Sequence, residues 1–170
     1  SNSLQNEVVR SITNALDIVL RDRDDVLVLN DVLVDWGKAG IAAMSPDVSV
    51  FFGDRLRGVL STYHVPEQGV TTEVVIEVTS PSTRSNDVEK KVVLYALCGV
   101  PRYVIVDARY DARGETLQSL ELKDYRAGAR GFELAAPDES GVVWLESLVF
   151  AVTTTWVLTY FLQGTYFVED

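Results

Sequence analysis

The sequence has too few cysteines and histidines to build a disulfide framework or a zinc cluster. Its 170 residues include one cysteine, Cys98, and one histidine, His64. One cysteine cannot form an intrachain disulfide, which fits a reducing compartment, so we expect a cytoplasmic protein. A lone histidine offers no metal cluster, and we interpret His64 as a polar surface residue. Zinc-ligand spacing, Gly-rich phosphate loops and internal repeats are also missing from the sequence.

Long apolar runs and excess positive charge are missing as well. No run reaches the roughly 18 apolar residues of a membrane span, and the first residues carry no charged-then-apolar signal, so we expect no membrane association. The 15 Lys and Arg residues are outnumbered by 25 Asp and Glu residues, which gives a formal net charge of −10 at pH 7. This charge argues against nonspecific coating of nucleic acid, but it leaves room for a local basic cleft.

The most informative stretch is residues 73–107. Val74–Val78 and Tyr103–Val106 have the length and the Val/Ile content of buried strands. The residues between them have helical periodicity, so the stretch is predicted to form a β–loop–α–β unit. A proline-containing loop ends the first strand, and Asn86 or Asp87 is the expected N-cap of the helix.

One charged side chain falls on the inward face of this predicted helix. At about 100° per residue, Lys91 lies within the apolar stripe, whereas Lys90 points toward water. The stripe consists of Val88, Val92 and Tyr95. A buried ammonium needs a partner, and Glu77 in the preceding strand is the carboxylate on offer. A structural Glu–Lys pair, or a lysine that extends to solvent, is the alternative to a functional site.

The rest of the chain is predicted to contain one long helix and many short strands. The helix covers Leu4–Leu20, with Glu7 beside its inner stripe, where an acid in the first turn could also serve the helix dipole. Gly53–Thr72 is expected to be a long polar loop. The expected strands are Val26–Leu29, Val32–Val34, Val48–Phe52, Thr116–Arg126, Gly131–Leu134, Val142–Leu145 and Thr153–Val168, the last with a bend at Gln163-Gly164.

A second carboxylate stands at the start of a predicted strand. Asp47 follows Pro46 and precedes Val48–Phe52. If this strand lies beside the strand of Glu77, the two carboxylates form a hard-oxygen site for a divalent cation such as Mg²⁺. A Pro-Asp pair alone is also typical of an ordinary turn.

The order and spacing of several short motifs resemble one known family. The motifs are Pro46-Asp47, Glu77-Val78-Thr79-Ser80-Pro81-Ser82, Asp87 with Lys91 and Tyr95, Gly99-Val100-Pro101-Arg102-Tyr103, and Val106-Asp107. Together they resemble the Uma-type family of putative restriction endonucleases, bacterial proteins of the PD-(D/E)XK nuclease superfamily. The resemblance covers most of the chain. It implies a single α/β (α+β) domain over residues 1–170, with a restriction-endonuclease-like mixed sheet and flanking helices over residues 3–111 and a β-rich C-terminal extension over residues 112–170.

The resemblance also implies roles for individual residues. Asp47 and Glu77 would hold Mg²⁺ or Mn²⁺, and Glu7 on the first helix would be a further metal ligand. The superfamily's usual lysine, two residues after the acid, is replaced here by Thr79. In the Uma-type pattern the following helix supplies the lysine, and Lys91 stands at that place.

The activity implied by the resemblance is metal-dependent cleavage of DNA. The metal would lower the pKa of a bound water and neutralise the phosphate, and Lys91 would orient that water or stabilise the developing charge. The backbone carbonyl of Val78 would join the metal ligands, while Arg84 and Lys90 would contact nucleic acid. The acidic net charge and the missing strand lysine leave two alternatives, an inactive nuclease fold that binds nucleic acid or protein and a structural dimer with a relic site.

Apolar residues in two places predict a homodimer. Val93 and Leu97 fall on the outer side of the Lys91 helix, where an isolated domain would prefer polar residues. The C-terminal tail is rich in aromatic residues: Trp156, Tyr160, Phe161, Tyr166 and Phe167. Nucleases of the superfamily often pair two subunits, and isologous dimers are the commonest assembly. The alternative is a tail that folds back over the helix within one subunit.

Overall fold

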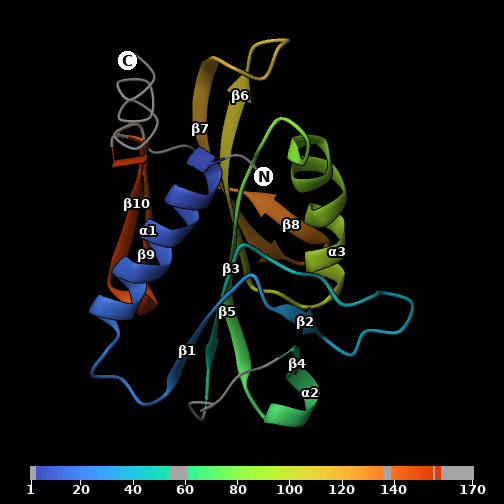
Figure 1. Ribbon diagram of the computed structural model, residues 1–170. Coiled ribbons are helices and arrows are strands. Elements are labelled where there is room, and N and C mark those ends of the chain that lie inside the picture. Colours follow the sequence, from blue (N-terminus) through green and yellow to red (C-terminus); the bar gives the residue numbers. More distant parts are fainter. Residues whose placement is uncertain (1–2, 54–60, 136–138, 155, 158–170) are drawn as a thin grey trace.

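The centre of the molecule is a six-stranded mixed sheet (Figure 1). The computed structural model describes residues 3–53, 61–135, 139–154 and 156–157. The strands lie in the order β1 (Val26–Asn30), β3 (Val48–Phe52), β5 (Thr71–Val78), β6 (Arg102–Tyr110), β7 (Leu117–Gly128) and β8 (Gly131–Leu134). β5 and β6 are parallel and the other neighbours are antiparallel.

Helices and two small sheets surround this central sheet. The helical segments are α1 (Ser3–Val19), α2 (Val65–Gln68), a π-helical turn (Asn86–Lys90), α3 (Lys91–Leu97) and a 3₁₀ turn (Glu146–Leu148). β2 (Leu33–Asp35) pairs in parallel with β4 (Thr62–His64), and β9 (Val142–Leu145) pairs antiparallel with β10 (Phe150–Thr153). Among the described residues, no helix has the length and hydropathy to cross a membrane.

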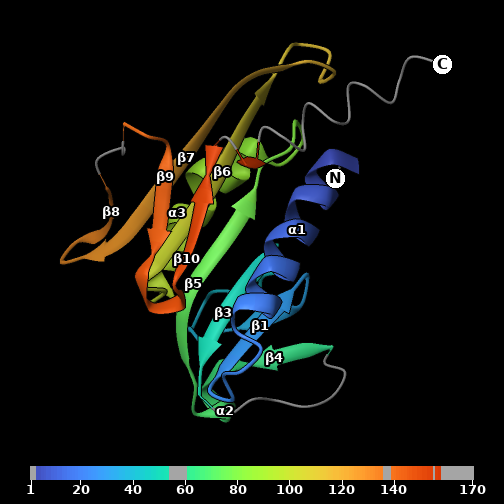
Figure 2. The same cartoon turned by 90° about the vertical axis from the view of Figure 1, so that its left-hand side faces the viewer.

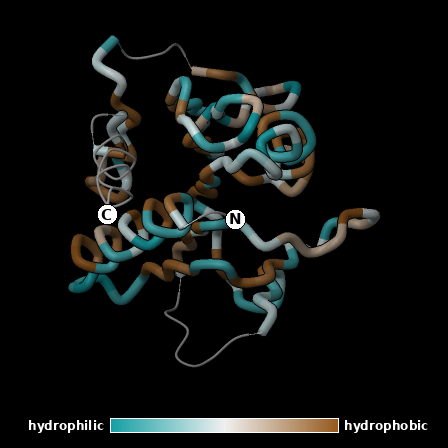
Figure 3. Tube along the Cα trace, turned by 45° about the horizontal axis from the view of Figure 1, so that its top comes forward, coloured by the Kyte–Doolittle hydropathy of each residue, from teal (hydrophilic) through white to brown (hydrophobic). Residues whose placement is uncertain are grey.

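The two faces of the central sheet carry separate hydrophobic clusters. α1 buries Val8, Ile12 and Leu16 on one face, where β9 and β10 also pack (Figures 1 and 2). Hydrophobic and hydrophilic residues alternate around α1, as expected of a helix with one buried side (Figure 3). α3 packs on the opposite face through Tyr95.

β5 is buried on both faces, and this explains its continuous apolar sequence. Val74, Ile76 and Val78 belong to the α1 cluster, while Val75 belongs to the α3 cluster. By the same alternation Glu77 faces α3. A carboxylate therefore enters the α3 side of the core near the end of a strand whose last five residues are all buried.

The predicted α/β fold with a mixed sheet and flanking helices is confirmed. The strands predicted over Val48–Phe52, Gly131–Leu134 and Val142–Leu145 have the observed bounds. The prediction of a long polar loop over Gly53–Thr72 is wrong where the structure describes it, since this stretch contains β4, α2 and the first residues of β5. Tyr63 explains part of the difference, because its ring is fully buried against Phe51.

The long terminal strand predicted over Thr153–Val168 is also wrong in its described part. Thr154, Trp156 and Val157 are helical. The Trp156 amide donates to Oγ1 of Thr153 at 3.0 Å, a side-chain cap that ends β10 and begins a turn. The predicted bend at Gln163-Gly164 lies outside the described residues.

β7 and β8 belong to the same sheet as the predicted nuclease core. β6 pairs with β7 from Arg102↔Arg126 to Tyr110↔Leu117, and β8 continues beyond β7. The expected boundary near residue 111 therefore falls in a hairpin of the central sheet, and residues 112–134 extend that sheet.

Candidate active site

Two carboxylates meet where β3 and β5 lie side by side. Val48 pairs with Ile76, so Asp47, at the start of β3, comes next to Glu77. Each residue binds backbone of the other strand: the Asp47 amide donates to Oε2 of Glu77 at 3.2 Å, and the Val78 amide donates to Oδ2 of Asp47 at 2.8 Å. The register of two strands thus fixes both side chains.

Lys91 approaches Glu77 from α3. Its Nζ lies 2.7 Å from Oε1 of Glu77 and 2.8 Å from Oδ1 of Asp87. The hydroxyl of Tyr95, one turn further along α3, donates to the same Oε1 at 2.8 Å. Lys91 and Tyr95 are four residues apart and therefore share one face of the helix.

Asp87 has a different place from the one predicted. Neither Asn86 nor Asp87 is an N-cap, because the Asp87 amide already donates to the carbonyl of Thr83 within the π-helical turn. The Asp87 side chain is buried and pairs with Lys91. Sequence reasoning missed this role, although the spacing of four residues between an acid and a lysine on a helix was a usable signal.

Burial and like charge dominate the electrostatics of the site. Glu77 is 2% exposed, and burial together with the neighbouring Asp47 charge raises its pKa to about 8 despite the opposing effect of Lys91. Burial also raises the pKa of Asp47. Burial lowers the pKa of Lys91, but the attraction of Glu77 and Asp87 outweighs it and the net pKa is raised. Lys91 is therefore a fixed cation between acids.

The donor set fits a magnesium ion that keeps most of its waters. Among the described residues, no three Asp, Glu, His or Cys side chains form a metal-binding cluster, so the chain offers the pair Asp47 and Glu77. Mg²⁺ is commonly held by one or two carboxylates together with water and substrate phosphate. Glu77 accepts from three donors, and a carboxylate has roughly four lone-pair directions. A cation would also relieve the repulsion between the two carboxylates.

α1 places the predicted third carboxylate at the surface. Glu7 is exposed and belongs to no metal-binding cluster of the described residues, so its role as a metal ligand stays a prediction. The inward residue at this end of α1 is Gln5, whose Nε2 donates to the carbonyl of Val78 at 2.7 Å. Glu7 lies two residues further on, about 200° around the helix, so its side chain is directed away from the sheet.

The family model described as "Uma2: Putative restriction endonuclease" matches residues 1–155. The chain belongs to this family. Among solved structures it is similar to the crystal structure of a putative nuclease belonging to DUF820 from Anabaena variabilis ATCC 29413, with a TM-score of 0.65 and 13% sequence identity over 94% of this chain and 83% of that chain. No curated protein matches. The family and the fold predicted from the sequence are both confirmed.

In this Uma2-family chain, a surface cavity reaches Asp47 from the α1 side. The cavity has a volume of ≈ 370 Å³. Its polar lining comes from α1 through Asn6 and Arg10 and from the β1 end through Asn30 and Asp31. The Nδ2 of Asn30 also donates to the carbonyl of Asp47 at 2.9 Å. Asp47 is therefore the carboxylate of the pair that a substrate can approach.

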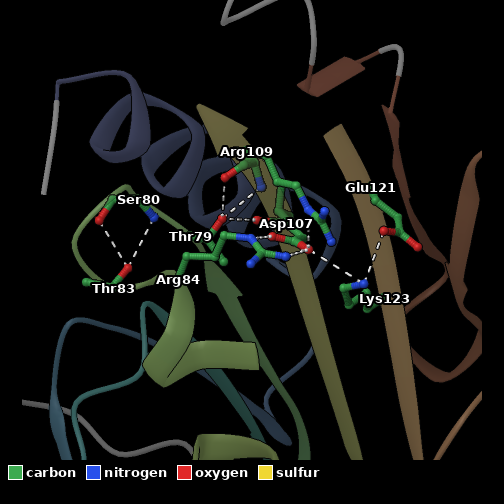
Figure 4. A network of polar contacts seen from close by, with 10 residues as sticks. Thr79, Ser80, Thr83, Arg84, Asp107, Arg109, Glu121 and Lys123 are labelled. Atoms are coloured by element: carbon green, nitrogen blue, oxygen red, sulfur yellow. Dashed lines mark hydrogen bonds and ion pairs between the residues drawn. The ribbon is translucent and has the colours of Figure 1, made fainter. Parts of the chain in front are cut away.

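The two predicted nucleic-acid contacts occupy different environments. Lys90 is exposed, and its side chain makes no ion pair among the described residues. Arg84 is held by a buried carboxylate: its Nε and Nη2 donate to the two oxygens of Asp107 at 2.7 and 2.9 Å (Figure 4). A bidentate pair of this kind fixes the plane of the guanidinium.

Proposed function

We propose that this protein is a metal-dependent nuclease that hydrolyses DNA phosphodiester bonds at the Asp47–Glu77–Lys91 site. The observation that carries the proposal is the convergence of these three side chains from β3, β5 and α3. The family description and the fold of the structural relative support a nuclease. Asp47 and Glu77 are the residues that would hold Mg²⁺ or Mn²⁺.

The protein's own groups have separate tasks in this proposal. Bound metal supplies a Lewis acid that polarises the phosphate and lowers the pKa of water. Lys91 stabilises negative charge that develops on the phosphate, as fixed cations do in phosphoryl transfer. Asp87 and Tyr95 are positioning residues: Asp87 holds the ammonium, and Tyr95 holds the carboxylate to which that ammonium is paired.

Thr79 supports the assignment of the lysine to α3. It is fully buried, and its Oγ1 accepts from the Ala108 amide at 2.7 Å and lies 3.1 Å from the Ala108 carbonyl. Its side chain links the end of β5 to β6, and a lysine at this buried position would place a charged group in the core. The lysine of the site is therefore assigned to Lys91.

One observation favours the alternative of an inactive nuclease fold that binds nucleic acid or protein. Both oxygens of Glu77 already accept hydrogen bonds within the chain, which is also how a purely structural buried carboxylate would be held. Cleavage distinguishes the two functions, because binding alone leaves DNA intact.

The test is cleavage of supercoiled plasmid in Mg²⁺, Mn²⁺ and EDTA. We expect nicked or linear product with either metal and none in EDTA. Asp47→Asn should remove cleavage, and Lys38→Ala, a loss of one positive charge at an exposed lysine with no assigned role, should preserve it. Intact plasmid with both metals, from a protein that still binds the DNA, would establish the binding function instead.

The predicted homodimer and the cytoplasmic location stay predictions. Val93 and Leu97 are 58% and 53% exposed on α3, as a subunit contact there requires. The aromatic residues of the tail beyond Val157 lie outside the described residues. Light scattering measures the assembly directly, since one chain has a mass of 18.8 kDa.

A further inference from the structure

We propose that a basic pocket at the β6–β7 turn binds a backbone phosphate of the nucleic-acid strand, about four nucleotides from the phosphate that is cleaved. The pocket has a volume of ≈ 410 Å³ and lies between this turn and the loop that follows β5. Its charged lining consists of Arg84, Arg109, Arg113 and Asp111. Three cations face one carboxylate in a chain of net charge −10. The identification of the ligand rests on the proposed nuclease function.

The one carboxylate of the lining is used by the turn itself. Oδ1 of Asp111 accepts from the amides of Arg113 and Glu115 at 3.2 and 2.9 Å. These backbone hydrogen bonds hold its pKa below the ordinary value. Asp111 therefore shapes the turn that presents Arg113, and the lining keeps an excess of positive charge.

The arginines are arranged around a buried anchor. The side chain of Asp107 is fully buried, and its oxygens lie 2.7 Å from Nε of Arg84, 3.6 Å from Nζ of Lys123 and 4.0 Å from Nε of Arg109 (Figure 4). Glu121 also pairs with Lys123 at 3.1 Å, but two carboxylates do not neutralise three cations. Arg84 takes the bidentate geometry, and the Arg109 side chain remains 55% exposed. The surplus charge is thus available to an external anion.

The walls of the pocket are held together by close packing. A Cβ on Gly114 would come within 3.3 Å of Cγ of Pro81, and the Gly114 φ of +72° is one that other residues rarely adopt. The β6–β7 turn therefore lies directly on the loop after β5. Arg84 and Arg113, from opposite walls, face the same space without a large conformational change.

The register of β5 and β6 places this pocket close to the candidate active site. Glu77 pairs with Ile105, and Asp107 lies two residues further along β6 on the same face. Two residues of strand span about 6.6 Å. Arg109, which lines the pocket, lies four residues beyond Ile105, about 13 Å along the strand. Because a nucleic-acid strand carries a phosphate about every 3.4 Å along a duplex axis, the pocket lies about four nucleotides from Glu77. A phosphodiester backbone is the ligand that fits both sites at once.

The test is the salt dependence of DNA binding in EDTA, where no cleavage occurs. Labelled duplex DNA is titrated by fluorescence polarisation with the wild type, with Arg109→Ala/Arg113→Ala and with Arg21→Ala/Arg130→Ala. The last variant removes the same charge at exposed arginines elsewhere. Each lost phosphate contact lowers the slope of log K against log salt by about 0.9. We expect the first variant, which loses the one phosphate contact of the pocket, to lose about 0.9 units of slope, so that the wild type's affinity falls roughly three- to fourfold more than the variant's between about 50 and 200 mM salt.

The controls separate this pocket from general electrostatics and from catalysis. The charge-conserving Arg109→Lys/Arg113→Lys variant should keep the wild-type slope. Equal losses in the two alanine variants, or no loss in the first, would overturn the proposal. The proposal would also be overturned if binding of inorganic phosphate depended on Arg109 and Arg113 but binding of DNA did not. Binding is measured without metal and is therefore independent of cleavage. If the Arg109→Ala/Arg113→Ala variant has a changed slope but the wild type cleaves no DNA, the nuclease proposal is refuted and the phosphate pocket is retained.

Discussion

The ammonium of Lys91 lies 2.7 Å from Oε1 of Glu77, although the two residues come from different elements, fourteen positions apart in the sequence. Glu77 ends a buried strand, and Lys91 begins the helix that covers that strand. The usual superfamily arrangement places acid and lysine on one strand. In this chain the lysine that pairs with the acid lies on the helix that follows the strand. The acid and the lysine therefore form an ion pair although they belong to different elements.

Substitutions at Thr79 test whether the strand position can still hold a lysine. Thr79→Val keeps the shape but leaves the Ala108 amide without its acceptor, and we expect a loss of about 1–3 kcal/mol in unfolding free energy. Thr79→Lys adds a buried charge and a longer side chain, so the loss should be larger. Urea denaturation measures both. If Thr79→Lys were as stable as the wild type, the strand position could still hold a lysine. Lys91 would then be an additional lysine and not a replacement for the strand lysine.

Tyr95→Phe isolates the hydrogen bond to Glu77. The substitution removes one donor from the buried carboxylate but keeps the ring, which packs edge-on against Trp36 and Tyr103 at centroid distances of 5.5 and 4.9 Å. Above about pH 8, where Glu77 is ionised, we expect a loss of about 1.5–3 kcal/mol, the range for a hydrogen bond to a charged group. Thermal or urea unfolding in EDTA provides the measurement. Stability equal to the wild type would mean that the hydroxyl does not hold Glu77.

The metal-free protein should lose stability as the pH rises toward 8. Burial and Asp47 raise the pKa of Glu77 from 4.5 to about 8, so between these values the folded state keeps a proton that the unfolded chain releases. The contribution is fully present below pH 4.5 and is lost as the pH rises through about 8, with a slope of at most about 1.4 kcal/mol per pH unit.

Glu77→Gln is the matched variant for this pH dependence. The amide has nearly the same shape and does not ionise, so its stability curve should be flatter across the same window. Urea midpoints in EDTA at a series of pH values compare the two proteins. Parallel curves would assign the pH dependence to other groups and remove Glu77 as its source.

The central β–loop–α–β unit was predictable because it is local. Consecutive residues contain the Val/Ile runs of β5 and β6 and the periodicity of α3. The helical phase alone selected Lys91 over Lys90. The order of the motifs identified Asp47 as the second carboxylate of the site. The predictions of these elements required no knowledge of which strands become neighbours.

The incorrect predictions depend on contacts that a linear pattern does not contain. The apolar stripe of α1 was predicted correctly through Val8 and Ile12, but Glu7 was taken from the family resemblance, and the inward polar residue Gln5 was not predicted. Asp87 was assigned to a cap because acids are common at helix starts, whereas the chain is already helical there. The joining of β7 and β8 to the central sheet is a long-range pairing, which the turn after β6 alone did not reveal.

The most direct test of the central claim is a comparison of Asp47→Asn and Lys91→Ala in paired measurements of Mn²⁺ binding and single-turnover DNA cleavage. If Asp47 holds metal and Lys91 stabilises the phosphate, Asp47→Asn loses both binding and cleavage. Lys91→Ala should then bind Mn²⁺ with little change and cleave about 10²-fold more slowly or worse, as when one fixed charge or donor is removed from a transition state. Lys38→Ala, at an exposed lysine with no assigned role, should match the wild type in both measurements. Wild-type cleavage by Lys91→Ala, or unchanged Mn²⁺ binding by Asp47→Asn, would contradict the account.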